Sequence, residues 1–144
     1  MTFTHALATN NYGPAKFIVD ASAANGTHTT IAAALTSASS GDTIFIRPGT
    51  YTENLTLKAG VNLAAYGCDS SLNNTGNVKI IGIATFTGAG TVTISGIQLQ
   101  TNSNNFLAVT GSAASVVNLN NCFLNCSNNT GINFTSSSSS SGIN

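Results

Sequence analysis

Apolar and polar residues alternate along most of the chain, in short runs separated by glycine, asparagine and serine. Alternation with a period of two, bounded by turn residues, predicts β-strands with one buried face. The strands predicted in this way cover residues 16–20, 43–47, 51–57, 61–66, 78–81 and 84–87. Pro48–Gly49 is predicted as a turn and residues 67–77 as a polar loop. The pattern therefore indicates an all-β chain built from many short strands.

One segment has the period of a helix instead. Its apolar residues fall at i, i+3, i+4 and i+7, which places them on one face; they are Ile31, Ala34, Leu35 and Ala38. Thr29 or Thr30 is suited to cap the first turn, and Gly41 is suited to a left-handed exit from the last turn. A short amphipathic helix is predicted over about residues 29–38.

The second half of the chain repeats. A shift of 25 residues places apolar residues on apolar residues and Asn104 on Asn129. The matched pairs are Val92 with Val117, Ile94 with Leu119, Ile97 with Cys122, Leu99 with Leu124, Leu107 with Ile132 and Val109 with Phe134. A repeat of this length that contains only short strands predicts stacked coils of a β-solenoid. The predicted helix would then cover the exposed N-terminal end of the stack.

Two regions stand apart from this repeat. Residues 1–15 are unpatterned and are interpreted as a tail, or alternatively as an attachment arm. Residues 16–144 are interpreted as one β-helical domain. The Ser-rich stretch 136–141 matches a connection one coil earlier, so Ile143 is expected to begin another coil, and the solenoid is expected to continue beyond residue 144 in a longer protein.

Charge is scarce and unevenly placed. Asp, Glu, Lys and Arg make up 6% of the 144 residues, the formal net charge is zero, and no such residue occurs from Ile80 onward. This composition argues against a nucleic-acid surface and a polybasic membrane patch. We recognise neither a secretory signal nor a transmembrane segment. Three cysteines do not form a disulfide framework, and Cys122 and Cys126 are interpreted as small buried residues.

Three stretches resemble the opening of the pectin-lyase-like superfamily. They are residues 30–35 (TIAAAL), 40–44 (SGDTI) and 48–55 (PGTYTENL). The later coils of that superfamily are similar to two further segments, residues 61–63 and 92–97. The resemblance covers roughly residues 16–134. It implies a right-handed parallel β-helix with an N-terminal capping helix, as in pectin methylesterases and phage tailspikes. It describes a scaffold more than a function.

The same superfamily contains enzymes, but this chain offers little for their chemistry. Glycoside hydrolysis requires paired carboxylates, and only four carboxylates are present, none after Asp69. We therefore assign no catalytic residue, no cofactor and no metal ligand. We expect structural roles instead. Asp42 would bond turn backbone and Asp20 would pair with Arg47. Glu53 and Lys58 would flank a strand on its solvent side, and His28 would serve the helix N-terminus.

The function that the sequence favours is a non-catalytic structural or receptor-facing module of a phage-like tail fibre, tailspike or surface fibre. One alternative is the N-terminal fragment of a polysaccharide-active enzyme. Another is a glycan-binding adhesin that stacks sugars on Tyr51 or Tyr66, although both rings can instead fill the core. Expected partners are further copies of the chain, as a homotrimer or fibre, and a cell-surface polysaccharide. The expected location is a virion or an extracellular surface.

Overall fold

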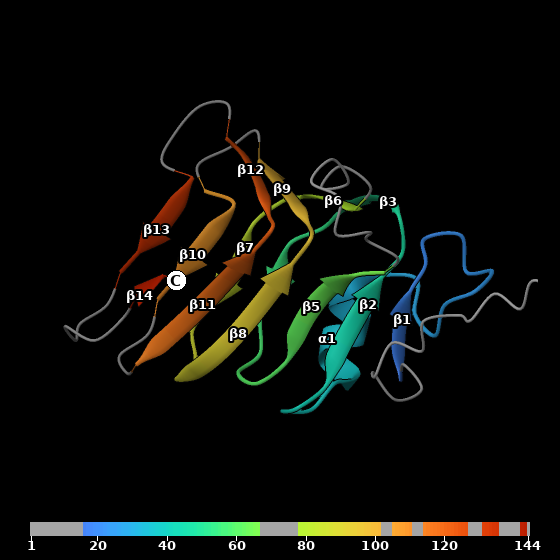
Figure 1. Ribbon diagram of the computed structural model, residues 1–144, viewed down its shortest axis with the longest axis horizontal. Coiled ribbons are helices and arrows are strands. Elements are labelled where there is room, and N and C mark those ends of the chain that lie inside the picture. The colour runs from blue at the N-terminus through green and yellow to red at the C-terminus, as the bar shows by residue number, and fades with distance from the viewer. Residues whose placement is uncertain are drawn as a thin grey trace, which may run out of the picture.

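The chain folds into a parallel β-solenoid of about four turns with one short helix near its N-terminus. The structure, a computed structural model, describes residues 16–66, 78–101, 105–110, 114–126, 131–135 and 142–143. In Figure 1 the coils follow one another from β1 to β14, so that the chain advances along the stack as it circulates. The predicted tail or attachment arm 1–15, the loop 67–77 and the Ser-rich stretch 136–141 lie outside the described residues.

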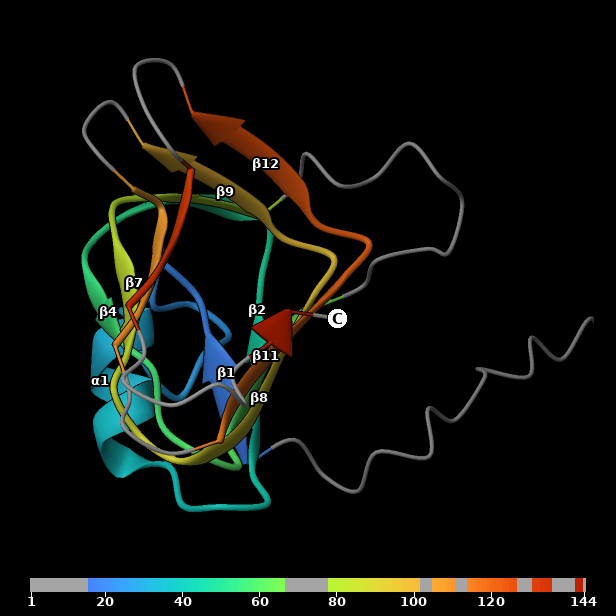
Figure 2. The same ribbon diagram turned by 90° about the vertical axis from the view of Figure 1, so that its left-hand side faces the viewer.

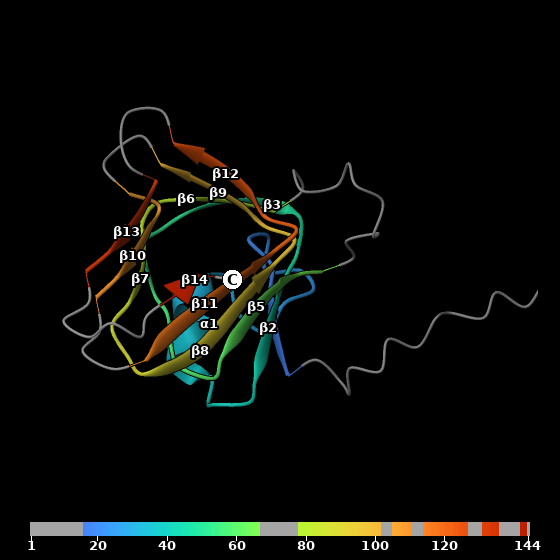
Figure 3. The same ribbon diagram turned by 60° about the vertical axis from the view of Figure 1, so that its left-hand side comes forward.

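The strands form three parallel sheets, which are the three walls of the solenoid (Figure 3). The first wall contains, in spatial order, β1 (Phe17–Val19), β2 (Thr43–Ile46), β5 (Asn62–Ala65), β8 (Gly90–Ser95), β11 (Ser115–Asn120) and β14 (Gly142–Ile143). The second contains β3 (Gly49–Thr52), β6 (Val78–Ile81), β9 (Gln98–Thr101) and β12 (Phe123–Cys126). The third contains β4 (Leu55–Thr56), β7 (Ala84–Phe86), β10 (Leu107–Val109) and β13 (Ile132–Phe134).

The register confirms the repeat predicted from the sequence. Val92 pairs with Val117 and Ile94 with Leu119 in the first wall, Leu99 pairs with Leu124 in the second, and Leu107 and Val109 pair with Ile132 and Phe134 in the third. Earlier coils are less regular: Ile44 pairs with Leu63, 19 residues on, and Leu63 with Ile94, 31 residues on. The longer coil contains residues 67–77. The predicted match of Asn104 with Asn129 lies outside the described residues.

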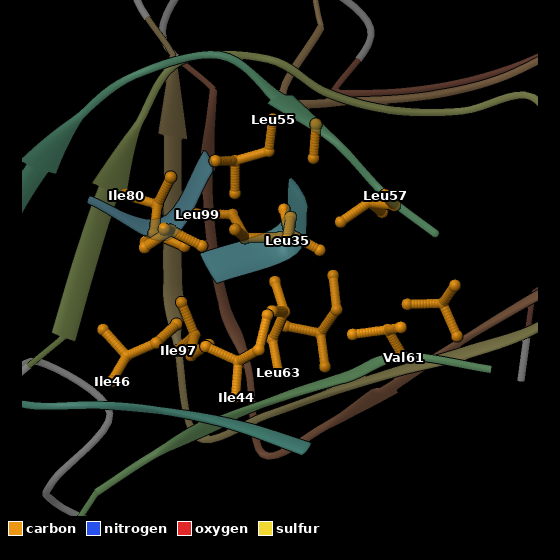
Figure 4. Packing of buried hydrophobic residues seen from close by; sticks show 14 of the residues in the cluster. Leu35, Ile44, Ile46, Leu55, Leu57, Val61, Leu63, Ile80, Ile97 and Leu99 are labelled. Atoms are coloured by element: carbon orange, nitrogen blue, oxygen red, sulfur yellow. The ribbon is translucent and has the colours of Figure 1, made fainter. Parts of the chain in front are cut away.

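Alternate side chains of each strand point inward and form the core. Residues in register stack on one another along the axis, so that Ile44, Leu63 and Ile94 form one buried column. Figure 4 shows Ile44 and Leu63 facing Leu55 and Leu99 from the opposite walls. Each fully buried Ile, Leu, Val or Phe contributes roughly 1.5–3 kcal/mol, and this burial offsets the ordering of the many polar residues outside.

The helix α1 (Ile31–Ser37) begins where the sequence predicts. The hydroxyl of Thr30 accepts a hydrogen bond from the backbone N–H of Ala33, and Ile31, Ala34 and Leu35 are buried. The predicted exit is wrong, however. The helix ends at Ser37 and Ala38 caps it in an extended conformation, while the positive φ of Gly41, +96°, belongs to the turn that follows.

One predicted strand, 51–57, is in fact two strands. β3 and β4 lie in different walls, and the chain turns the corner between them at Glu53–Asn54. The corner fits against the next coil, because the side-chain oxygen Oδ1 of Asn54 accepts a hydrogen bond from the backbone N–H of Ile83 at 2.9 Å. A Cβ on Gly82 would collide with the carbonyl oxygen of Glu53. The predicted turn at Pro48–Gly49 is shorter than expected, since β3 already starts at Gly49.

Candidate functional site

The outer surface of the first wall carries an exposed aromatic side chain beside an arginine. The ring of Tyr66 meets that of Phe45 edge-on at 6.3 Å between centroids, and the guanidinium carbon of Arg47 lies 4.8 Å from the Tyr66 centroid. Tyr66 is 39% exposed. We call Phe45, Arg47 and Tyr66 the aromatic patch. It has the composition of a carbohydrate-stacking surface, with a flat ring and hydrogen-bond donors next to it.

Strand order explains why these three residues meet. Phe45 and Arg47 point outward because Ile44 and Ile46 point into the core. Tyr66 follows β5, the neighbour of β2 in the wall, and its backbone N–H donates to the carbonyl of Ile46 at 2.7 Å. An arginine over an aromatic face contributes about 0.5–1 kcal/mol at an exposed site.

Asp20 anchors the arginine from the preceding coil. Its Oδ2 lies 3.9 Å from Arg47 Nε, which confirms the predicted ion pair. Its Oδ1 accepts from the hydroxyl of Ser22 at 2.6 Å and from the backbone N–H of Ser22 at 2.9 Å. These two hydrogen bonds hold the pKa of Asp20 below its ordinary value of 3.8, and the charge of Arg47 acts in the same direction. Arg47 Nε is buried and, among the described residues, has no hydrogen-bond partner.

Beside the patch runs a column of neutral polar side chains. Thr43 is in register with Asn62, and Thr93 with Asn118. The Asn62 side chain links the two pairs, because its Oδ1 accepts from the backbone N–H of Thr93 at 3.0 Å. All four residues are half-buried and lie on the outward face of the wall. Amides and hydroxyls in such a row are donors and acceptors that suit sugar hydroxyls.

The two tyrosines singled out in the sequence have different environments. Tyr51 is 4% exposed, and its hydroxyl donates to the carbonyl of Arg47 at 2.9 Å. Burial raises the pKa of Tyr51 above its ordinary value of 10.0. Its ring therefore offers no face to a sugar, and of the two tyrosines Tyr66 alone has an exposed ring.

Glu53 and Lys58 lie on either side of β4; Lys58 is exposed and Glu53 is half-buried, and both side chains also bind α1, which the sequence did not indicate. The two carboxylate oxygens of Glu53 accept from the backbone N–H groups of Ile31 and Ala32 at 3.0 and 2.9 Å. The ammonium of Lys58 donates to three carbonyl oxygens at the other end of α1, those of Leu35, Thr36 and Ala38, the last at 2.6 Å. Both charges are used to hold the helix.

The predictions for Asp42 and His28 have opposite outcomes. Asp42 bonds turn backbone as expected, accepting from the N–H of Ser39 at 2.7 Å, and also pairs with Lys16 at 3.5 Å. His28 does not serve the start of the helix. Its Nε2 lies 3.3 Å from the hydroxyl of Ser37, at the end of α1, and its ring packs 5.7 Å from that of Phe17.

The side chains of Cys122 and Cys126 are partly buried and pack against the core. Cys122 Sγ lies 3.3 Å from the carbonyl oxygen of Ile94, and burial raises the pKa of this thiol above its ordinary value of 9.0. A protonated, partly buried thiol is a poor nucleophile and a poor metal ligand. Asp69 and Cys68 lie outside the described residues.

Within the part of the chain that the structure describes, no three His, Cys, Asp or Glu side chains lie close enough to hold a metal ion together. Among the same residues, no helix has the length and apolar character needed to cross a membrane. Sequence reasoning had identified Tyr66 but not its neighbours Phe45 and Arg47. The alternation of apolar and polar residues along β2 was enough to show that Phe45 and Arg47 point outward. Their contact with Tyr66 could not be predicted in this way, because it depends on which strand lies beside β2.

Comparison with known proteins gives no relative. The chain matches no protein-family model, no curated protein and no solved structure.

Proposed function

We propose that this chain is a non-catalytic structural or receptor-facing module of a phage-like tail fibre, tailspike or surface fibre. We place it in the pectin-lyase-like superfamily of right-handed β-helices, on the strength of the helix, "SGDTI" and "PGTY" stretches. These stretches correspond to α1, to the turn before β2 with the first two residues of β2, and to β3. A rigid stack of coils with few charged side chains suits a spacer in a fibre.

The proposal rests on the contacts of the three carboxylates that the structure describes, each of which binds another part of the scaffold. Glu53 caps α1, Asp42 closes the turn before β2, and Asp20 is bound to Ser22 and Arg47. General acid–base chemistry on a glycosidic bond needs two carboxylates facing one substrate. These three are instead committed to the scaffold, on different parts of the first coils.

A turnover assay tests the absence of catalysis. The purified chain is incubated with pectin and with a panel of bacterial capsular polysaccharides, and release of reducing ends, unsaturated products or methanol is followed. We expect none above a heat-unfolded sample. Turnover that disappears in Asp42→Asn or Asp69→Asn, with the fold intact by circular dichroism, would instead support the polysaccharide-active enzyme.

Electron microscopy of the native assembly tests the rest of this proposal. A fibre or spike with a β-helical shaft, on a virion or a cell surface, is the expected image. Three-fold symmetry would also support the homotrimer that the resemblance implies. A soluble monomer without any attached structure would contradict the structural module.

A second function is favoured by the aromatic patch. Tyr66 exposes its ring, Arg47 adds guanidinium donors, and the column of Thr and Asn lies on the same wall. This arrangement supports glycan binding, with cell-surface polysaccharide as the ligand. On a glycan array, binding is expected to be lost in Tyr66→Ala and retained in Tyr66→Phe, which keeps the ring. Equal binding by the unaltered chain and both variants would exclude the aromatic patch as the glycan-binding site.

A further inference from the structure

The loop between β1 and α1 carries the one Asn–Gly dipeptide of the sequence, Asn25–Gly26. Figure 2 shows this loop in blue, between the two elements. Asn25 is exposed and Gly26 is half-buried. An asparagine side chain can react with the backbone nitrogen of the residue that follows it, and glycine leaves this approach open because it has no Cβ. The sequence therefore places a reactive amide in an exposed loop.

Packing against Asp20 explains why glycine stands at position 26. A Cβ on Gly26 would lie 2.8 Å from both the Cβ and the backbone nitrogen of Asp20, and 3.0 Å from the carbonyl oxygen of His28. A backbone hydrogen bond fixes this close approach, since the N–H of Asp20 donates to the carbonyl of His28 at 3.0 Å. The fold therefore requires the same residue that makes Asn25 reactive.

The attacking nitrogen is available in the folded chain. The next two residues, Thr27 and His28, donate their backbone N–H groups to the carbonyl of Ile18 at 2.8 and 3.1 Å. Among the described residues, the N–H of Gly26 has no such partner. A hydrogen bond opposes loss of the proton that the attack requires, because breaking the bond costs free energy. The nitrogen of Gly26 is not restrained in this way.

We propose that Asn25 is a site of spontaneous modification in the folded chain, where it is converted to aspartate and isoaspartate. The backbone nitrogen of Gly26 attacks Cγ of Asn25; a new C–N bond forms, that of the side-chain amide breaks, and ammonia leaves with the displaced proton. Water then opens the cyclic imide at either carbonyl carbon. One opening gives aspartate, and the other leaves the peptide bond on the side-chain carbon, as isoaspartate. These steps need only water, and they do not depend on the proposed fibre function.

The product carboxylate lies beside an ion pair. Asp20 Oδ2 lies 3.9 Å from Arg47 Nε, and Arg47 in turn lies over the ring of Tyr66. The hydroxyl and N–H of Ser22 bind the carboxylate of Asp20 and lower its pKa, and the backbone N–H of Asn25 acts in the same direction. A negative charge at position 25 therefore repels Asp20, and isoaspartate also lengthens the backbone beside it. Modification of the loop thus loosens the group that anchors Arg47.

The test is incubation of the whole chain in native buffer at neutral and mildly alkaline pH, with circular dichroism to confirm that it stays folded. A protease that cleaves before aspartate releases residues 20–41, in which Asn25 is the only asparagine. The aspartate product adds a cut after Ala24. The isoaspartate product resists this cut, but an isoaspartyl methyltransferase labels it. Conversion of Asn25 is expected to be about tenfold faster or more than that of Asn54, an exposed asparagine followed by leucine.

Asn25→Gln is the matched control, because it keeps a neutral amide whose longer side chain closes the ring slowly, and no new cut or label is expected. Asn25→Asp supplies the product charge directly. It is expected to lower the urea midpoint of unfolding, and to lower it less in an Asp20→Asn background, where the repulsion is absent.

Conversion of Asn25 that is no faster than that of Asn54, or that occurs only when the chain is unfolded in urea, would overturn the proposal. An equal shift of the midpoint in both backgrounds would overturn the effect on Asp20.

Discussion

Glu53 and Lys58 stand on either side of β4 and hold opposite ends of the same helix. The carboxylate of Glu53 accepts from the first N–H groups of α1, and the ammonium of Lys58 donates to its last carbonyls. Each charge is opposite in sign to the end of the helix dipole that it meets. A helix of seven residues is too short to be stable alone, so these contacts and its buried face keep it in place.

Glu53→Gln is expected to lower the free energy of unfolding by about 1–2 kcal/mol, because one charge-assisted acceptor is lost and the other becomes neutral. Urea unfolding followed by circular dichroism measures the change. Lys79→Gln, which removes a charge from β6, is the control and is expected to change stability by less than about 0.5 kcal/mol. Equal losses in the two variants would contradict the capping role of Glu53.

Lys58→Met keeps most of the aliphatic stem and removes the donor to three carbonyl groups. A loss of about 1–3 kcal/mol is expected from unfolding curves. The double variant Glu53→Gln/Lys58→Met should lose less than the sum of the single losses, because α1 released at one end no longer needs the other contact. Strict additivity would show that the two ends of the helix are held independently.

Leu99→Ala and Leu124→Ala compare the same position in two successive coils. Leu99→Ala is expected to cost about 2–5 kcal/mol, as for a buried leucine. Leu124→Ala is expected to cost about 1 kcal/mol in the monomer, since 39% of the side chain is exposed before the substitution. The comparison is made in unfolding experiments at the lowest protein concentration that gives a signal. Equal costs would mean that the last coil is covered.

Asp20 is expected to contribute to the acid sensitivity of the fold. Its pKa is lower in the folded chain than the ordinary value of 3.8, because Ser22 donates two hydrogen bonds to the carboxylate. Its stabilisation is therefore complete above the unfolded-state pKa and is lost as the pH falls through the lower folded-state pKa. Between pH 4.5 and 2, Asp20→Asn should lose less stability than the unaltered chain. If the free energy of unfolding falls equally with pH in the variant and in the unaltered chain, this assignment is contradicted.

The sequence by itself determined which aliphatic residues of most strands face the core and how the last two coils align. Alternation reports the two faces of a strand, and the 25-residue repeat places Val92 on Val117 and Leu107 on Ile132, as the register confirms. The hydroxyl of Thr30 and the apolar stripe behind it were enough to locate α1. These features are local or repeated, so the pattern along the chain contains them.

Other features depend on which segment of the chain lies next to a residue, and only the tertiary structure decided these. The corner at Glu53–Asn54 has no glycine or proline to mark it, and it exists because Gly82 of the next coil leaves room for it. Tyr51 and Tyr66 both follow strand-like patterns, yet one is buried beneath Arg47 and the other exposed beside it. The sequence places Glu53 and Lys58 beside a strand, but only the folded chain brings them to the two ends of α1. Long side chains reach partners that sequence distance does not reveal, and only packing brings those partners within hydrogen-bonding range.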